Sequence, residues 1–272
     1  MELDVVVCAK NQAKHLDRVL RQIVHNVPLK NLIVIYATSV DDTEQTAKKY
    51  TNNVFWDEDK GLGAARNLGI MKATSEIVAM IDADVILTEG WYQQLIEHLQ
   101  NPRVAAVIGT CIYGYGYKPL ESYYEYLRRT DDQNLGCQNT MFRREAVLKV
   151  GNFDSSIKGA GEDYDLYQRL VAAGYEWIWV REATVYHPMS MNEYLKHVRW
   201  WVTGHPYMDE IVQGRVSLLR FYMRQVLAIL HAFCMGVKLF FVHPTLLLFI
   251  PIIGTTCAFE KFKELKKARK QP

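Results

Sequence analysis

The sequence predicts an α/β fold, a doubly wound and mostly parallel sheet, followed by an apolar helical segment near the carboxyl end. Three observations predict it. Between residues 3 and 84, short β-branched runs alternate with helical patterns, and polar side chains follow several of those runs. Between Val226 and Phe259, the only formally charged side chain is Lys238. Alternating strands and helices are typical of sheets whose ligands bind outside the carboxyl ends of the strands.

The first elements follow from hydrophobic periodicity and turn chemistry. The strands are expected at Leu3–Cys8, Leu32–Tyr36, Val54–Trp56 and Ile77–Ile81. A helix is expected after the first strand, because Leu16, Val19, Leu20, Ile23 and Val24 fall on one helical face. A second helix is expected after Thr43, and a glycine-opened helix is expected over residues 61–73.

Composition limits the class of protein. The 272 residues are 49% hydrophobic and 23% charged, which excludes a disordered chain. Lys and Arg number 32 against 30 Asp and Glu, so the net charge of +2 makes nucleic acid an unexpected partner. The five cysteines form no CxxC pair, and the amino-terminal residues do not have the pattern of a secretory signal. A reducing compartment fits best.

Polar residues gather where the predicted strands end. Ala9 and Asn11 come after the first strand, Asp41 after the second, and Asp82 and Asp84 after the fourth. Two carboxylates one residue apart are expected to project toward the same crevice at the end of the sheet. Oxygen ligands of this kind suit Mg²⁺ or Mn²⁺ together with substrate phosphates, although a DxD triplet by itself is often a solvated loop.

Several further motifs occur in one order along the chain. These are SVDDT at residues 39–43, GLGAARNLG at 61–69, RR at 143–144, VGNFD at 150–154 and GEDYDL at 161–166, with Arg169, Leu170 and Gly174 behind them. Together with the DxD triplet, they resemble the family 2 glycosyltransferases, inverting enzymes of the GT-A fold. The resemblance spans roughly residues 3–205. It implies a nucleotide-diphosphate sugar as donor, a divalent metal ion, Mn²⁺ or Mg²⁺, and inversion at the anomeric carbon.

The resemblance also implies roles for the acidic pair. Asp84 is expected to coordinate the metal that bridges the diphosphate, and Asp82 to meet the ribose or the sugar. In many relatives a histidine at the position of His187 is a further metal ligand, and a neutral imidazole suits Mn²⁺. The alternative for His187 is a structural role.

The nucleotide is expected to contact Ala9, Asn11, Asp41, Gly61 and Arg66. Two alternatives stay open: Arg66 as a helix-surface arginine, and the glycines of GLG as relief of backbone crowding. The sequence departs from the family pattern at Tyr36-Ala37, where paired acidic residues usually meet the base and ribose. Asp41 could take over the base contact, and either UDP or GDP is compatible with the pattern.

Asp163 matches the aspartate that acts in the family as general base on the acceptor hydroxyl, with Glu162 as an orienting neighbour. A carboxylate with a raised pKa in a closing cleft can do this work. The alternative is that both acids stabilise the amino terminus of a helix over residues 164–173. Farther on, residues 196–200 (KHVRW) resemble the QxxRW segment of processive relatives with Lys196 in place of glutamine. This favours addition of a single sugar, and Arg199 remains a candidate contact for the donor diphosphate.

The carboxyl-terminal third has the pattern of a membrane-associated segment. Arg220, Arg224, His231 and Lys238 share one stripe of a helix, as in helices that lie in the membrane interface. Leu239–Phe259 is uncharged over 21 residues, about 31 Å as a continuous helix at ~1.5 Å per residue. Pro244 and Pro251 argue against a simple span, so a re-entrant hairpin is preferred. A helix pair buried at the interface of a homo-oligomer is the alternative.

Three parts are therefore expected: a catalytic domain over residues 1–210, an amphipathic helix with a membrane-inserting segment over 211–259, and a basic tail over 260–272. The tail has six basic and two acidic residues, a net charge of +4. The chain is expected to be a metal-dependent inverting hexosyltransferase at the cytoplasmic face of a cell membrane, acting on a lipid-linked or other saccharide acceptor. A polyprenyl-phosphate sugar synthase and a catalytically silent membrane scaffold are the alternatives.

Overall fold

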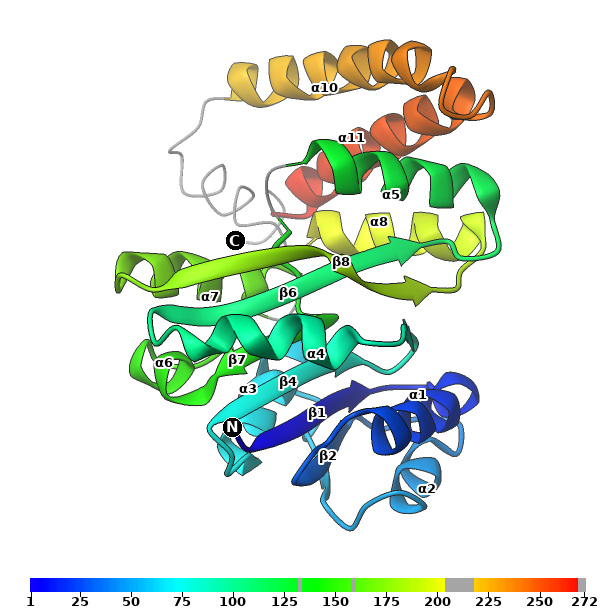
Figure 1. Ribbon diagram of the computed structural model, residues 1–272. Helices are drawn as coiled ribbons and strands as arrows, with labels where there is room; N and C mark the ends of the chain where they lie inside the picture. The colour runs from blue at the N-terminus through cyan, green and yellow to red at the C-terminus, as the bar shows by residue number, and fades with distance from the viewer. Residues whose placement is uncertain (132–133, 158–159, 204–217, 269–272) are drawn as a thin grey trace. The chain divides into compact units, whose positions relative to one another are not determined.

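The computed structural model describes residues 1–131, 134–157, 160–203 and 218–268 (Figure 1). The chain forms two compact units. Unit 1 contains residues 1–112, 130–158 and 162–188. Unit 2 contains residues 113–129, 159–161 and 189–272. Each unit is described by itself below.

An eight-stranded sheet forms the centre of unit 1, in the strand order β3-β2-β1-β4-β7-β6-β8-β5. Most of its strands are buried runs of apolar residues, as expected when helices cover a sheet. The bounds are β1 (Leu3–Ala9), β2 (Asn31–Tyr36), β3 (Val54–Trp56), β4 (Ile77–Asp82), β5 (Ile86–Leu87), β6 (Val104–Tyr113), β7 (Asn139–Arg143) and β8 (Glu176–His187).

The sheet is mixed, which corrects the expectation of a mostly parallel sheet. Strands β1 to β4 pair in parallel, as the alternation of strands and helices predicts. Beyond β4 the pairs β4–β7, β6–β7 and β5–β8 are antiparallel. In this half the chain does not alternate strictly between strand and helix, so the parallel rule for such repeats does not apply.

Helices cover the sheet of unit 1. α3 packs on β1 and β2, α6 on β7, and α4 and α7 on β8, while α1 packs against α2 and β5. Figure 1 shows α1 and α2 beside the strands β1 and β2. The bounds are α1 (Ala13–Asn26), α2 (Thr43–Lys48), α3 (Leu62–Lys72), α4 (Trp91–Ile96), the 3₁₀ helix η1 (Glu97–Gln100), α6 (Arg144–Lys149) and α7 (Glu162–Ala172).

The alternation of side chains along β4 decides where Asp82 points. Val78 and Met80 belong to the same buried cluster as Ala65 and Ile70 of α3. Because side chains two residues apart in a strand lie on one face, Asp82 at the end of β4 also faces α3. Burial of this cluster therefore positions a carboxylate beside the first turns of α3.

Two glycines shape the start of α3. Gly61 precedes the helix with φ of 101°, a conformation that other residues rarely adopt. Gly63 lies against the loop that leads into α7, where an added Cβ would be 2.7 Å from the backbone oxygen of Asp154. Relief of backbone crowding, one of the alternatives for this glycine pair, thus accounts for Gly63.

Unit 2 is helical in the part that the structure describes, with α5 (Lys118–Thr130), α8 (Met191–Thr203), α10 (Leu218–Leu239) and α11 (Leu246–Ala268). Its core is aromatic: Tyr194 stacks on Phe249, and its hydroxyl lies 3.0 Å from that of Tyr124. α11 packs against both α8 and α10.

The uncharged stretch Leu239–Phe259 is not one helix, so its length of about 31 Å does not apply. α10 ends at Leu239 and α11 begins at Leu246, because the chain turns where Pro244 cannot continue a helix. Pro251 lies inside α11. Among the residues described, no helix combines the length and apolar character needed to cross a bilayer. Residues 204–217, which span the end of the expected catalytic domain and the start of the expected membrane segment, and residues 269–272 of the expected tail lie outside the described residues.

Candidate active site

Three charged side chains from separate elements of unit 1 meet at the end of β4. The guanidinium of Arg66, on α3, donates to Glu162 at the start of α7, and its Nη2 lies 3.3 Å from Asp82 Oδ1. Arg66 is only 5% exposed and Glu162 1%. Arg66 therefore pairs with one buried carboxylate, Glu162, and with Asp82, whose side chain is 35% exposed, so it is not the helix-surface arginine that one alternative expected.

Asp84 and His187 form a second group beside this network. His187 Nε2 lies 3.1 Å from Asp84 Oδ1, and both side chains are largely buried. Gln12, which precedes α1, donates from Nε2 to Asp84 Oδ2 at 3.0 Å. Burial lowers the pKa of His187, but contact with the carboxylate of Asp84 outweighs it and raises that pKa overall. The structure thus brings together the two residues expected to hold a metal.

Asp163 is the second residue of α7 and is half-buried. Burial and the adjacent charge of Glu162 raise its pKa to about 6, against the opposing effect of Arg66. Its Oδ1 accepts a hydrogen bond from the backbone of Tyr164 at 2.8 Å. Asp163 therefore stabilises the first turn of α7 and also has the raised pKa that a general base needs, so the two roles are compatible.

A cavity of unit 1 opens at the carboxyl ends of β1, β2 and β3. Ala9 and Gly61 line it, as expected for a nucleotide contact, and so do Lys10, Ala37 and Asp57. Asp57 directly follows β3 and is 7% exposed, and burial raises its pKa. Asp57 was not among the predicted site residues, although ligand-binding residues follow strand ends and Asp57 follows β3.

Asn11 and Asp41 connect neighbouring loops of unit 1. Asn11 Oδ1 accepts from the backbone of Val40 at 2.8 Å, and Asp41 Oδ2 accepts from the backbone of Ala13 at 3.0 Å. Asp41 also accepts from the hydroxyl of Thr43, and this bond chiefly lowers its pKa. Both side chains join the loop after β1 to the loop after β2, and Asp41 lines a second cavity with Tyr36 and Trp56.

Arg199 lies in unit 2, on α8, where its Nε is 3.5 Å from Glu260 Oε1 on α11. Its expected contact with the donor remains a prediction.

The residues at the end of β4 fit a divalent cation. No group of three or more His, Cys, Asp or Glu side chains arranged for a metal occurs among the residues that the structure describes. Asp84 and His187 supply one oxygen and one nitrogen donor that already converge, and Asp82 adds a carboxylate nearby whose pKa burial raises. Such a donor set suits Mn²⁺ or Mg²⁺, which commonly take their remaining ligands from phosphates and water.

Comparison with solved structures identifies the same fold. A mannosyltransferase from Pyrobaculum calidifontis, in complex with GDP-Man and Mn²⁺, is similar over 96% of this chain and 87% of its own, with a TM-score of 0.66 and 16% identity. A glucosyl-3-phosphoglycerate synthase from Mycobacterium tuberculosis, in complex with Mg²⁺ and UDP, is similar over 75% of this chain and 77% of its own, with a TM-score of 0.55 and 20% identity.

The chain is also similar in sequence to known glycosyltransferases. It is 33% identical to a pre-mycofactocin glycosyltransferase of Mycobacterium tuberculosis over 132 residues, which cover 42% of this chain and 27% of that relative. The chain thus spans about a quarter of that relative's length. Residues 4–151, more than half of the chain, match the model of glycosyl transferase family 2. That range includes Arg66, Asp82 and Asp84. The chain belongs to glycosyl transferase family 2.

Proposed function

We propose that the protein is a metal-dependent inverting glycosyltransferase that moves one hexose from a UDP- or GDP-sugar to an acceptor at a membrane surface. The observation that carries this proposal is the convergence of Asp82, Arg66, Glu162 and the Asp84–His187 pair in unit 1, with Asp163 beside Glu162 on α7. The neighbours crystallised with UDP and Mg²⁺, or with GDP-Man and Mn²⁺, support the donor class and the metal.

In this proposal, Asp84 and His187 hold the metal. When bound, Mn²⁺ or Mg²⁺ supplies Lewis-acid stabilisation of the negative charge that develops on the leaving diphosphate. Arg66 pairs with both the buried Glu162 and the partly exposed Asp82. The buried network thereby fixes the end of β4 and the start of α7, which carry the reacting groups.

Asp163 takes the proton. The acceptor hydroxyl oxygen forms a bond to the anomeric carbon as the bond from that carbon to the diphosphate breaks. The bonding electrons leave with the nucleoside diphosphate, and the hydroxyl proton passes to the carboxylate of Asp163. A raised pKa suits a base for a hydroxyl acceptor. A phosphate acceptor is already ionised and needs no base, so the pKa of Asp163 favours a saccharide hydroxyl over polyprenyl phosphate.

The cavity beside β1, β2 and β3 is the proposed nucleoside site. Its shape is set by Ala9, Ala37 and Gly61, whose small side chains leave room for a flat base. Asp57 supplies a carboxyl group with a raised pKa that can hydrogen-bond to the base or ribose. In this proposal Asp57, one strand farther along the sheet, replaces the acidic pair that is missing at Tyr36-Ala37.

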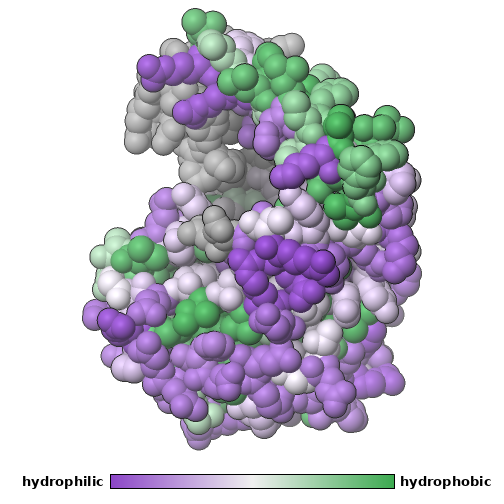
Figure 2. Space-filling model, turned by 45° about the horizontal axis from the view of Figure 1, so that its top comes forward, coloured by the Kyte–Doolittle hydropathy of each residue, from purple (hydrophilic) through white to green (hydrophobic). Residues whose placement is uncertain are grey.

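The surface of α10 supports a membrane-borne acceptor. One face of this helix bears an apolar stripe of side chains that are each more than half exposed: Leu219, Met223, Val226, Leu230, Phe233 and Val237. Arg220, Arg224, His231 and Lys238 are exposed along one edge of this apolar stripe. Figure 2 shows hydrophobic residues gathered on the surface where α10 and α11 join. An apolar face with a basic edge is typical of helices that lie in an anionic membrane interface.

Donor binding tests the proposed function directly. A panel of UDP- and GDP-sugars is expected to include one that raises the melting temperature by several degrees in Mn²⁺ and not in EDTA, since a ligand of the native state stabilises it. Asp84→Ala is expected to lose the Mn²⁺-dependent part of the shift. Glu89→Gln is the matched control, because Glu89 is an exposed acid five residues away. A shift that is equal in EDTA, or unchanged in Asp84→Ala, would contradict the proposal.

The pH dependence of transfer is expected to report Asp163. A pKa of about 6 keeps this carboxyl protonated, and inactive as a base, to a higher pH than an ordinary aspartate. Transfer measured as kcat/KM should therefore fall about tenfold per pH unit below that pKa and level off above it. Asp165→Asn is the control, because Asp165 lies on the same helix and pairs with Arg169. In this variant, transfer activity should fall at the same pH as in the wild type. A midpoint near pH 4 would exclude Asp163 as the titrating base.

A further inference from the structure

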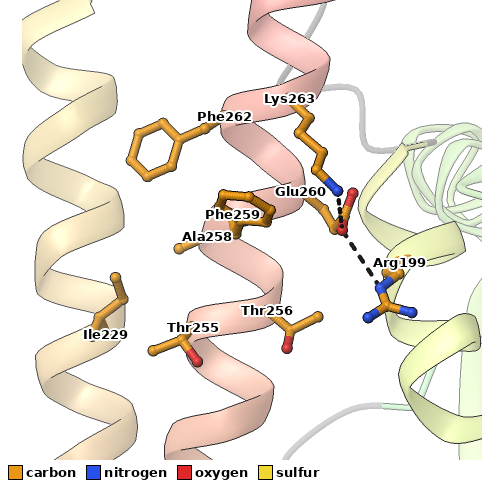
Figure 3. Close-up of a pocket in the computed structure, with 9 residues that line it drawn as sticks. All are labelled: Arg199, Ile229, Thr255, Thr256, Ala258, Phe259, Glu260, Phe262 and Lys263. Atoms are coloured by element: carbon orange, nitrogen blue, oxygen red, sulfur yellow. Dashed lines mark hydrogen bonds and ion pairs between the residues drawn. The ribbon is translucent and has the colours of Figure 1, made fainter. Parts of the chain in front are cut away.

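Unit 2 contains an open cavity of about 720 Å³ between α10 and α11, with Arg199 of α8 at its side (Figure 3). This volume lies within the range of about 300–1,000 Å³ that small-molecule sites occupy. α10 contributes Ile229, and α11 contributes most of the remaining lining. All of these residues lie in unit 2, and Arg199 is the one among them that the sequence predicted to contact the donor.

One side of the cavity is cationic. Glu260 Oε1 lies 3.0 Å from Lys263 Nζ and 3.5 Å from Arg199 Nε. The side chain of Glu260 is 12% exposed, whereas those of Lys263 and Arg199 are 49% and 50% exposed. One carboxylate thus holds two half-exposed cations in place, and the three charges sum to +1. Guanidinium and ammonium groups have several donors each, so both can bind a further anion such as a phosphate.

The rest of the cavity wall is mainly apolar, and it begins beside the cations, since Lys263 Nζ lies 4.7 Å from the centre of the Phe259 ring. Ile229, Phe259 and Phe262 line it, and Phe259 is 60% exposed. Ile229 is three residues after Val226 and four before Phe233, so it adjoins these members of the apolar stripe on the helix surface. The apolar wall of the cavity therefore continues onto the exposed face of α10.

We propose that this cavity binds the phosphate-bearing end of a lipid, with Arg199 and Lys263 on the phosphate and the first part of the hydrocarbon chain against Ile229 and Phe259. Neighbouring cationic and apolar walls match an amphiphile with an anionic head better than a free sugar or a free anion. The inference rests on the proposed function, in which such a lipid carries the acceptor saccharide, and it identifies the part of the chain that holds the lipid.

Binding of farnesyl phosphate to the full-length protein tests this inference, with inorganic phosphate and farnesol as separate probes. Calorimetric titration is expected to show farnesyl phosphate bound at least tenfold more tightly than either part alone. Lys263→Ala should weaken farnesyl phosphate about 10- to 100-fold, the usual effect of losing a hydrogen bond to a charged group. Phe259→Ser should weaken farnesyl phosphate more than it weakens inorganic phosphate, because the ring contacts Lys263 as well as the proposed path of the hydrocarbon chain. Both replaced side chains are at least about half exposed, so the fold should persist.

Lys118→Ala is the matched control, because Lys118 is an exposed cation that pairs with Glu121 elsewhere in unit 2. Unchanged binding in both Lys263→Ala and Phe259→Ser would overturn the inference. Equal affinity for inorganic phosphate and farnesyl phosphate would make this an anion site and also overturn the lipid assignment. Failure of the proposed function can be told apart from failure of this inference. If the proposed function is wrong, the donor panel shows no Mn²⁺-dependent shift in melting temperature, whether or not binding of farnesyl phosphate depends on Lys263.

Discussion

Replacing Asp163 by asparagine is expected to lower kcat for sugar transfer by about 10²- to 10⁴-fold, the usual contribution of a positioned general base. Asparagine has nearly the shape of aspartate but cannot take the proton from the hydroxyl group of the acceptor sugar. Donor affinity should change little, because the metal and nucleotide are held by other residues in the proposed site. Steady-state transfer rates and donor titrations of the two proteins measure these quantities separately.

The stability of the same variant distinguishes loss of a base from loss of structure. Because the pKa of Asp163 is raised from 3.8 to about 6, ionisation of this carboxyl lowers the stability of the folded protein as pH rises between these two values, and the cost persists above pH 6. A neutral side chain removes this cost, so Asp163→Asn should melt at the same temperature as the wild type or higher at pH 8. Asp165→Asn, two residues farther along α7, should keep its activity. A kcat within tenfold of the wild type, or an equal loss of donor binding, would show that Asp163 is not the base.

Replacing Arg66 by methionine is expected to reduce the free energy of unfolding by about 3–5 kcal/mol, the typical cost of leaving a buried charge without its partner. Arg66 contacts the carboxylates of both Asp82 and Glu162; it donates to Glu162 Oε1, and the buried Oε2 has no hydrogen-bond partner among the described residues. Without the guanidinium, these acids would have to be protonated or exposed to water. Urea unfolding at pH 7.5 measures the loss.

Two further variants show whether charge is the cause. Arg66→Met combined with Glu162→Gln should recover part of the lost stability, because the second change removes one of the unpaired charges. Arg21→Met should leave the urea midpoint nearly unchanged, since its pair with Asp17 is exposed. If Arg66→Met were as mild as Arg21→Met, the buried network would not hold the site together.

Local patterns predicted the first half of the fold well. The buried, β-branched runs at β1, β2, β3 and β4 were identified to within about two residues, because strands covered on both sides leave a clear apolar signal. β8, which runs from Glu176 to His187, leaves a weaker signal in the sequence. Arg181 and Glu182 interrupt its apolar pattern. The antiparallel pairs depend on contacts distant in sequence, which periodicity does not report.

The candidate site was predicted mainly from its motifs. The sequence motifs alone predicted five site residues: Asp82, Asp84, Glu162, Asp163 and His187. The sequence did not predict the partner of Arg66, because an ion pair that joins α3 to α7 spans 96 residues of sequence and leaves no local pattern. Asp57 was not predicted, because β3 is only three residues long and gives a weak strand signal in the sequence.

The configuration of the released sugar tests the central claim most directly. The donor identified by the thermal-shift panel is left to hydrolyse slowly in the presence of the protein, and proton NMR at early time points records the released sugar. The acceptor need not be known, because water takes the place of its hydroxyl group. A single displacement assisted by Asp163 should release the sugar from an α-linked donor first as the β anomer, and only in the presence of Mn²⁺ or Mg²⁺. Release of the α anomer would contradict inversion, and an unchanged rate in EDTA would contradict metal dependence.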